Sequence, residues 1–315
     1  MIGIRALGQS IASHTISNLD RAKISGKDED FIRDKIGFVS VARATPETQA
    51  SDLCVAAFED LCKRTTVRAN QLDCVVVCTQ NPDGKGLPHT SAIVHKKLGF
   101  PKGVACFDIS LGCSGYVYGL SIILGFMQAN GMQNGLLFTA DPYSRILDHK
   151  DWNTELLFGD AATCTWISSN PIYRIRPPMF GTDGNLGHSI QIDPVAGTLS
   201  MLGSNVFKFC MTVVPQQIIA YLTRESLSIN DIDIFLFHQG SRFIVESLAK
   251  KLGLPPAKVP FEATHTGNTV SSSLPLLPLS RLNDRPARIL LSGFGVGLSW
   301  ATMILDNNQE ISDET

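Results

Sequence analysis

Charged residues are scarce in this chain: they make up 18% of its 315 residues, against roughly 25% in an average soluble domain. The formal net charge is only −2, so the composition gives no sign of a surface that binds nucleic acid or another polyanion. Apolar residues reach 44%, and the chain is long enough to bury a large core. We therefore expect an extensive interior or interface and no nucleic-acid partner.

The chain also has no long apolar run, and we expect no secretory signal. Its first residues, "MIGIRALGQSIASHTI", do not place a charged region before an apolar one. The longest apolar stretch, "GYVYGLSIILGFM", contains glycines and is shorter than the roughly 18 apolar residues of a membrane span. We expect no membrane association and a cytoplasmic location.

Eight cysteines are present, but none forms a C-x-x-C pair. Cys74, Cys78 and Cys106 lie in or beside apolar runs, which indicates reduced core residues of a cytosolic protein and neither a disulfide framework nor a zinc site. The sequence contains no G-x-S-x-G elbow, no Walker loop and no strand–G-x-G-x-x-G–helix unit. We expect neither a metal nor a cofactor. Four histidines show no metal-ligand spacing and are assigned to loops or the surface: His89, His95, His149 and His265.

A repeated phrase divides the chain into two halves. "KKLGFP" begins at Lys96 and "KKLGLP" at Lys250, and the blocks around them also match: "NQLDCVVVCTQ" with "NDIDIFLFHQ", and "GLLFTADP" with "RILLSGFG". Matched blocks in one order indicate a duplication; coincidence between two generic α/β sequences is the weaker interpretation. We assign residues 1–170 to an N-terminal half, residues 171–307 to a C-terminal half and residues 308–315 to a polar tail.

The apolar segments predict a layered α/β fold. "LDCVVVC", "GLLFTA", "IDIFLFH" and "RILLSG" are continuous apolar runs, typical of strands that helices cover on both faces. "CSGYVYGLSIILGFMQANG" is apolar all round and predicts a helix buried on every side, with "NTVSSSLPLLPLSRL" as its counterpart. One buried helix per half predicts five layers: helix, sheet, central helices, sheet, helix.

Three residues in this pattern could carry chemistry. Cys113 opens the first buried helix, where the helix dipole is expected to lower the pKa of a thiol. His238 follows the strand "DIFLFH", and Asn268 occupies the position in the second half that corresponds to Cys113. A pseudo-twofold axis between the halves would bring all three together. The alternatives are that Cys113 is one more core cysteine and that His238 is a buried structural histidine.

These motifs together resemble the thiolase superfamily and, within it, the β-ketoacyl-acyl-carrier-protein synthase III family. They are Cys113 at the helix start, "HQ" after a strand, "GNT" and the late "GFGVGLSW". The similarity runs over nearly the whole chain, from "DEDFIRDKIGF" through "LLFGDAAT" to "SGFGVGLSW". It implies a thiolase-like five-layered α-β-α-β-α fold from two duplicated halves. It also implies an acyltransferase that condenses an acyl thioester with malonyl-acyl-carrier protein, with loss of CO2, through an acyl-Cys intermediate.

The resemblance assigns roles to five residues. Cys113 resembles the acylated nucleophile of the family, and His238 and Asn268 match the pair that holds the thioester carbonyl of the second substrate. The backbone N–H groups of Cys113 and Val296 match the family's oxyanion hole. Phe294 matches the aromatic residue beside the histidine and the asparagine.

Other positions depart from the family pattern. Phe31 and Trp152 stand where a tryptophan and an arginine usually hold the adenine of coenzyme A, and Lys35 stands where the family has an arginine. Leu87 replaces an aromatic residue in the loop that shapes the acyl pocket. These departures leave the identity and carrier of the acyl donor open, and with them the choice between fatty-acid initiation and a specialised pathway. Basic residues fall where the family receives an acidic carrier protein, although a solvated basic face is an equal alternative: Lys208, Lys250 and Lys251, with Arg242 nearby.

The resemblance implies acyl-coenzyme A and acyl carrier protein as partners, and a homodimer in which Leu87 reaches the partner's acyl pocket. Two alternatives to condensation remain open. The acyl group could go to an oxygen, nitrogen or preformed β-keto nucleophile, or the chain could be a non-catalytic subunit that supports an active partner. Asn268 favours condensation, because relatives with other acceptors often alter that asparagine.

Overall fold

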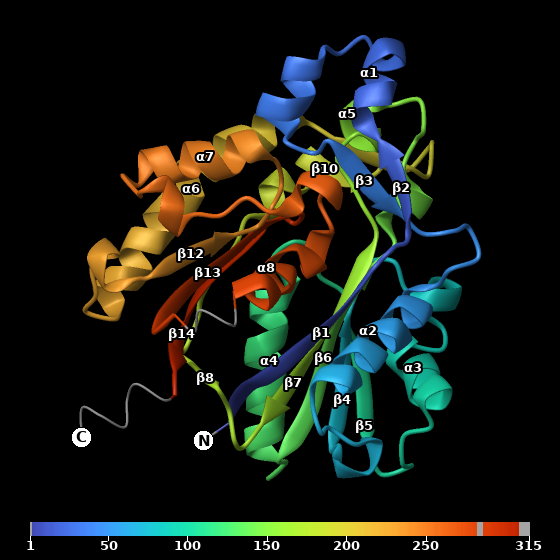
Figure 1. Ribbon diagram of the computed structural model, residues 1–315, viewed down its shortest axis with the longest axis vertical. Coiled ribbons are helices and arrows are strands. Elements are labelled where there is room, and N and C mark those ends of the chain that lie inside the picture. The colour runs from blue at the N-terminus through green and yellow to red at the C-terminus, as the bar shows by residue number, and fades with distance from the viewer. Residues whose placement is uncertain (1, 282–285, 309–315) are drawn as a thin grey trace.

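The computed structural model describes residues 2–281 and 286–308; residues 309–315 of the predicted polar tail lie outside this part of the chain. A mixed sheet dominates the described residues (Figure 1). Its strands are β1 (Gly3–Ile11), β4 (Cys74–Cys78), β5 (Ala105–Ile109), β6 (Asn134–Asp141), β7 (Ala161–Ser168), β8 (Tyr173–Ile175), β9 (Met179–Thr182), β12 (Ile234–Phe237), β13 (Arg288–Gly295) and β14 (Ser299–Asn307). They follow the order β12-β13-β14-β8-β1-β7-β6-β4-β5, with β9 paired to β14.

Two short strand pairs, eight α-helices and several short 3-10 or π-helical turns complete the described fold. The pairs are β2 (His14–Ser17) with β3 (Ser40–Arg43), and β10 (Ile190–Ile192) with β11 (Leu199–Met201). The helices are α1 (Asn18–Ser25), α2 (Ala50–Arg64), α3 (Thr90–Leu98), α4 (Gly115–Ala129), α5 (Trp152–Glu155), α6 (Gly203–Arg224), α7 (Arg242–Lys251) and α8 (Ser273–Arg281).

The matched sequence blocks form equivalent strands. β4 runs parallel to β6, with Cys74 opposite Gly135, and β12 runs parallel to β13, with Ile234 opposite Ile289. β6 and β13 then pair antiparallel with β7 and β14. The first half adds an edge strand, β5, beside β4, whereas residues 259–262 in the matching block of the second half form no strand. The boundary that we predict at residue 170 lies in the turn between β7 and β8.

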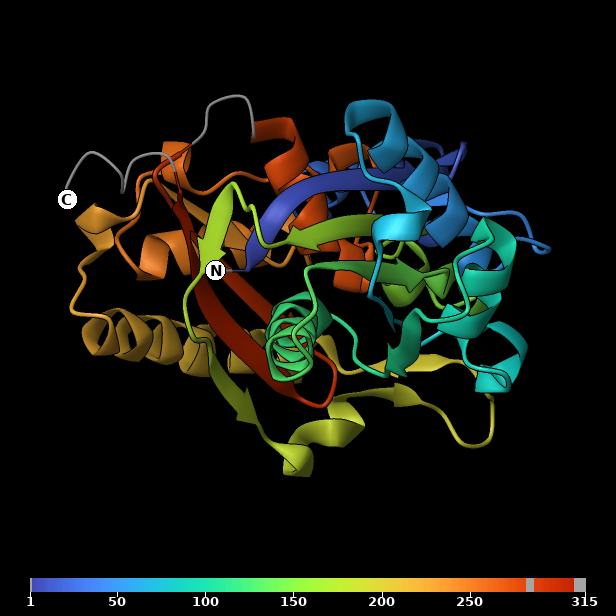
Figure 2. The same ribbon diagram turned by 90° about the horizontal axis from the view of Figure 1, so that it is seen from below.

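Of the four apolar cores among the described residues, three separate five layers. Alternate side chains of a strand point to opposite faces of the sheet, so each strand contributes to two cores. In β4, Val76 packs in the central core with α4 and α8, while Val77 packs under α2 and α3. In β12, Leu236 enters the same central core and Phe237 faces α6 and α7. Figure 2 shows α4 end-on in the middle of the molecule. The predicted thiolase-like five-layered fold is confirmed.

The long helices are core helices. The α4 side chains of Tyr116, Leu120 and Ile123 are fully buried. Ile122, on another face of α4, is 39% exposed, so the prediction of a helix buried on every side is wrong for that face. Among the described helices, α6 alone has the length and hydropathy of a membrane span. It runs through Pro215 without ending, and its apolar face packs against β13, β14 and α7, as in the interior of a globular protein.

Candidate active site

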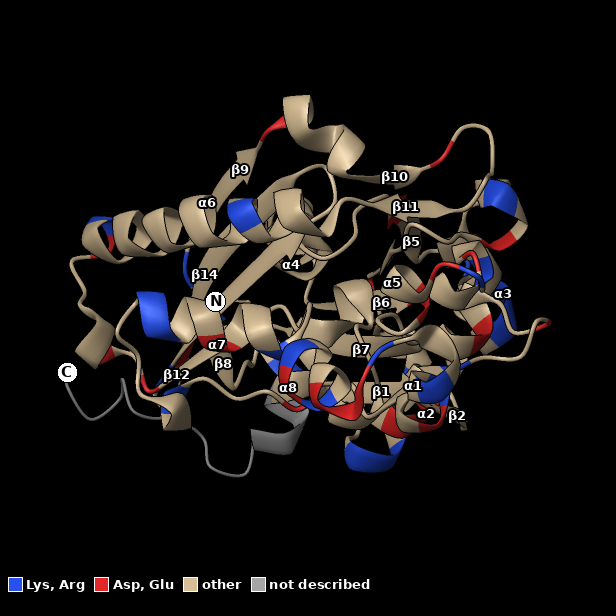
Figure 3. Ribbon diagram, turned by 90° about the horizontal axis from the view of Figure 1, so that it is seen from above, with Lys and Arg blue, Asp and Glu red and all other residues tan. Residues whose placement is uncertain are grey.

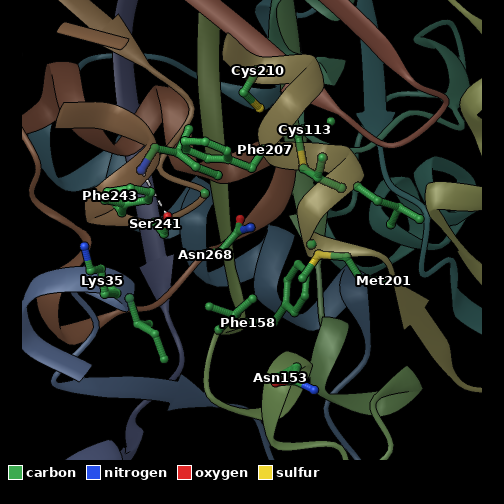
Figure 4. A pocket seen from close by; sticks show the side chains of 18 of the residues that line it. Lys35, Cys113, Asn153, Phe158, Met201, Phe207, Cys210, Ser241, Phe243 and Asn268 are labelled. Carbon is green, nitrogen blue, oxygen red and sulfur yellow. Dashed lines mark hydrogen bonds between the residues drawn. The ribbon is translucent and has the colours of Figure 1, made fainter. Parts of the chain in front are cut away.

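A cavity of about 670 Å³ lies where the central helices begin. Cys113, His238, Asn268 and Phe294 all line it. Figure 4 shows Asn268 in the middle of this space, with Cys113 and Cys210 beyond it. The structure thus brings the three candidate residues together, one from the first half of the chain and two from the second.

Cys113 lies just before α4 and is 7% exposed. The backbone N–H groups of Val296 and Cys113 act to lower the pKa of this thiol. Burial, and then the negative charge of Asp141, act in the other direction and raise the pKa of Cys113 to about 12. The expectation of a lowered pKa is therefore wrong for this cavity, because desolvation of the thiolate outweighs the helix dipole.

His238 directly follows β12, and its backbone N–H donates to Ser292 O at 2.9 Å. The side chain is 3% exposed, and burial lowers the pKa of His238 to about 3. Its ring meets the Phe294 ring edge-on, with centroids 5.6 Å apart. The imidazole is consequently neutral at physiological pH, and one ring nitrogen carries a proton that it can donate.

Asn268 is held in place by its own backbone. Its N–H donates to Leu157 O at 2.8 Å, and its carbonyl accepts from Gly159 N at 3.0 Å. The side-chain Oδ1 accepts from Val270 N at 2.9 Å. This bond fixes the orientation of the amide, so Nδ2 is the atom left to face the cavity as a hydrogen-bond donor.

An aromatic and basic mouth opens the cavity. Phe31, Trp152 and Lys35 line it, as do Phe207 and Phe243. The Lys35 ammonium lies 4.2 Å from the centre of the Phe243 ring, and Phe243 stacks on Phe207 with centroids 5.1 Å apart. Sequence reasoning missed these two phenylalanines, because no local pattern shows that residues on α6 and α7 meet in space.

The rest of the wall is mainly apolar and was also missed. Tyr143 contacts Phe158, with ring centroids 5.0 Å apart, and donates its hydroxyl proton to Gln80 Oε1 at 2.8 Å. The sequence offered one signal, since Phe158 belongs to the block "LLFGDAAT". Further lining residues of this kind are Ile190, Met201 and Cys210.

Leu87 does not line the cavity of its own chain. Its side chain is 87% exposed, in the loop between β4 and α3. Asp108 of the edge strand β5 accepts hydrogen bonds from the backbone N–H groups of Thr90 and Ser91, at 2.6 and 2.8 Å. The loop that carries Leu87 is therefore tied to the open edge of the sheet.

The basic residues on α6 and α7 differ in solvent exposure and in their contacts with other residues. Lys208, Lys250 and Lys251 are exposed, and Figure 3 shows basic positions on both helices. Arg242, in contrast, donates from Nε to Arg33 O at 3.2 Å, and its guanidinium lies over the Phe261 ring at 4.5 Å. Arg242 thus ties the start of α7 to the segment that carries Phe31 and Lys35.

Comparisons with known proteins decide the family. Residues 107–184 match the family described as 3-oxoacyl-[acyl-carrier-protein (ACP)] synthase III, and residues 222–306 match its C-terminal part. The β-ketoacyl-[acyl-carrier-protein] synthase III of Deinococcus deserti is 31% identical over 95% of this chain and 89% of that one. The Streptococcus gordonii protein of the same name is 31% identical over 92% of this chain and 94% of its own. The chain belongs to the β-ketoacyl-acyl-carrier-protein synthase III family.

Solved structures agree. A crystal structure of 3-oxoacyl-(acyl-carrier-protein) synthase III is 33% identical, covers 97% of this chain and 99% of its own, and superposes with a TM-score of 0.91. The Thermus thermophilus β-ketoacyl-[acyl-carrier-protein] synthase III is 29% identical, with coverage of 96% and 98% and a TM-score of 0.89. The resemblance based on "GNT" and "GFGVGLSW" is confirmed. The protein is a condensing enzyme of the ketoacyl synthase III type, an acyltransferase.

Proposed function

We propose that this ketoacyl synthase III condenses an acyl thioester with malonyl-acyl-carrier protein through an acyl thioester on Cys113. One observation carries the proposal. A single cavity is lined by the Cys113 thiol and by Val296, together with a neutral imidazole and an amide Nδ2. The thiol suits acyl transfer, and the neutral donors suit an anion that forms beside it.

The first half-reaction loads Cys113. Its sulfur attacks the carbonyl carbon of the acyl thioester, and the carbonyl oxygen becomes an oxyanion that the N–H groups of Cys113 and Val296 stabilise. One such donor contributes about 3–4 kcal/mol in comparable sites. The C–S bond of the donor then breaks, and the leaving thiolate takes up the proton that Cys113 has lost.

The second half-reaction requires hydrogen-bond donors but no general base. The malonyl carboxylate leaves as CO2, and the bonding electrons form an enolate whose oxygen accepts hydrogen bonds from His238 and Asn268. The enolate carbon attacks the acyl carbonyl, the Cys113 thiolate leaves and regains a proton from solvent, and a β-ketoacyl product remains. A carboxylate in place of Asn268 would repel the forming negative charge.

This reaction requires no cofactor, since side chains and backbone N–H groups supply all of its chemistry. We assign carrier-protein docking to α6 and α7, which contribute Phe207 and Phe243 to the mouth. The exposed Lys208, Lys250 and Lys251 complement an acidic partner. Arg242 serves this surface by holding the start of α7. All eight cysteines are free, which supports a cytoplasmic location.

We also propose a homodimer. The edge strand β5 is partly exposed at every residue, and an unpaired edge is a template for pairing with another strand. Apolar side chains continue from it along α4: Phe107 contacts Phe126 of α4 at 5.1 Å between ring centroids. Tyr118 of the same helix packs against Phe180 of β9, which is 44% exposed. Pairing of two β5 strands would cover this surface and carry Leu87 towards the second cavity. A monomeric mass by light scattering at micromolar concentration would refute it.

Measuring acylation of Cys113 distinguishes condensation from transfer to another acceptor and from a non-catalytic role. The enzyme is incubated with a panel of acyl thioesters, and the mass of the Cys113 peptide is measured before and after malonyl-acyl-carrier protein is added. Condensation predicts a Cys113 adduct of short to medium acyl groups and release of CO2. Another acceptor predicts the adduct without CO2, and a non-catalytic subunit predicts no adduct. Cys210→Ser is the matched control, because Cys210 lines the same cavity and should not carry the acyl group.

A further inference from the structure

His238 has a side-chain partner that the mechanism above does not use. Its Nδ1 lies 2.6 Å from Ser273 Oγ, and both side chains are 3% exposed. Ser273 is the first residue of α8, the second central helix. The contact therefore joins the end of β12 to the start of the helix that follows Asn268.

The direction of this hydrogen bond follows from the surroundings. A buried hydroxyl proton needs an acceptor, and among the described residues the only hydrogen-bond partner of Ser273 Oγ is His238 Nδ1. If Nδ1 carried the proton, the Ser273 proton would have no acceptor. If Oγ–H donates to Nδ1, the hydroxyl proton and the ring nitrogen are both satisfied, and the ring proton must be on Nε2.

From this geometry we propose that Ser273 is a positioning residue that fixes His238 as the Nε2–H tautomer. The inference rests on the proposed function and deepens it. Only this tautomer presents a donor to the enolate oxygen, while the other presents a lone pair that would repel it. Ser273 thereby makes His238 a hydrogen-bond donor in the condensation half-reaction and prevents it from acting as a base there.

The neighbouring serines supply a matched control. "VSSS" places three hydroxyls in a row, each with a different partner. Ser271 Oγ bonds to the Asp141 carboxylate, and Ser272 Oγ lies 2.8 Å from Thr139 Oγ1 and 3.2 Å from Thr139 O. Ser272 is as buried as Ser273, but its hydroxyl forms its hydrogen bonds with Thr139 and Ala161 O instead of the imidazole. Loss of its hydroxyl should affect local packing without changing the tautomer.

The experiment compares Ser273→Ala with Ser272→Ala. Nitrogen-15 NMR of histidine-labelled enzyme reports the tautomer, with the His238 signals assigned by their absence in His238→Ala. Rates of Cys113 loading by acyl-coenzyme A and of malonyl-acyl-carrier-protein decarboxylation are measured on the same samples. We expect the wild type and Ser272→Ala to show the Nε2–H form. Ser273→Ala should show a mixture of tautomers and load Cys113 within about twofold of the wild type. Its rate of malonyl-acyl-carrier-protein decarboxylation should fall at least roughly 10-fold. The upper limit is the roughly 10²–10³-fold loss expected when an oxyanion donor is removed completely.

An Nδ1–H tautomer in the wild type would overturn the inference, and so would unchanged Nε2–H spectra and decarboxylation in folded Ser273→Ala. Equal losses in Ser272→Ala and Ser273→Ala would assign the effect to packing and would also refute it. The NMR measurement of the tautomer does not depend on catalytic activity. If the wild type neither loads nor decarboxylates, the proposed function fails while the tautomer is still tested.

Discussion

Gly295 lies directly against the thiol of Cys113: a Cβ atom at Gly295 would sit 2.8 Å from Sγ and 2.7 Å from Cβ of that cysteine. Gly295→Ala should therefore displace the thiol from its two N–H donors and reduce acyl loading at least 10-fold, as measured by the mass of the Cys113 peptide. Gly125→Ala is the control, because a Cβ there meets nothing within 4 Å. Normal loading of folded Gly295→Ala would show that the sulfur attacks from another position.

The two half-reactions should respond to different substitutions. Cys113→Ser should abolish loading, because no base is present to generate an alkoxide at neutral pH. Asn268→Ala should still load Cys113, while decarboxylation falls by roughly 10²–10³, the usual cost of one lost oxyanion donor. His238→Ala should resemble Asn268→Ala, because both side chains serve as donors to the enolate. If folded Asn268→Ala loaded as poorly as Cys113→Ser, the division between the half-reactions would be wrong.

The raised pKa of Cys113, about 12, gives a definite pH dependence. The thiolate fraction far below the pKa rises tenfold per pH unit, so alkylation of Cys113 by iodoacetamide should accelerate about tenfold per unit from pH 7 to 9 without a plateau. Asp141 contributes to the raised pKa through its charge, so Asp141→Asn should be alkylated faster at any one pH. Site-specific mass spectrometry is needed, because the exposed thiol of Cys62 also reacts with iodoacetamide. A plateau with a midpoint below pH 8 would contradict the buried-thiol picture.

Coenzyme A should bind weakly at this mouth. Phe31 and Trp152 line it without the guanidinium that stacks on an adenine ring. Phe31→Trp combined with Trp152→Arg should lower the dissociation constant for coenzyme A, measured by calorimetry with the unaltered enzyme as reference. An unchanged or higher constant would show that the adenine is held elsewhere.

Leu87 should control the acyl group of a neighbouring subunit. Because it is 87% exposed in its own chain, Leu87→Trp should leave the fold intact and shorten the longest acyl group that loads Cys113. Ile24→Trp changes another exposed residue, on α1, and should leave the accepted chain length unaltered. If wild type and Leu87→Trp accepted acyl groups of the same lengths, Leu87 would not be part of the acyl pocket.

The position of the site could be predicted from the sequence, because two duplicated halves are expected to pack about a pseudo-twofold axis. Cys113 and Asn268 occupy corresponding places, so an axis between the halves brings their helices together. The protonation of the thiol could not be predicted. A helix start is visible in the sequence, but the depth of burial is not, and neither is the approach of Asp141 from the end of β6. The Phe207–Phe243 stack was hidden for the same reason: it depends on how α6 and α7 lie together.

The short strand β8 makes the two halves inseparable. Its Arg174 pairs with Gly3 of β1 on one side and with Asp306 of β14 on the other, so one sheet runs through both halves. The central core likewise takes side chains from both, and either half alone would expose that face of its sheet to water. We expect the whole chain to melt in a single cooperative transition, and a chain cut between β7 and β8 to stay assembled until both pieces unfold together.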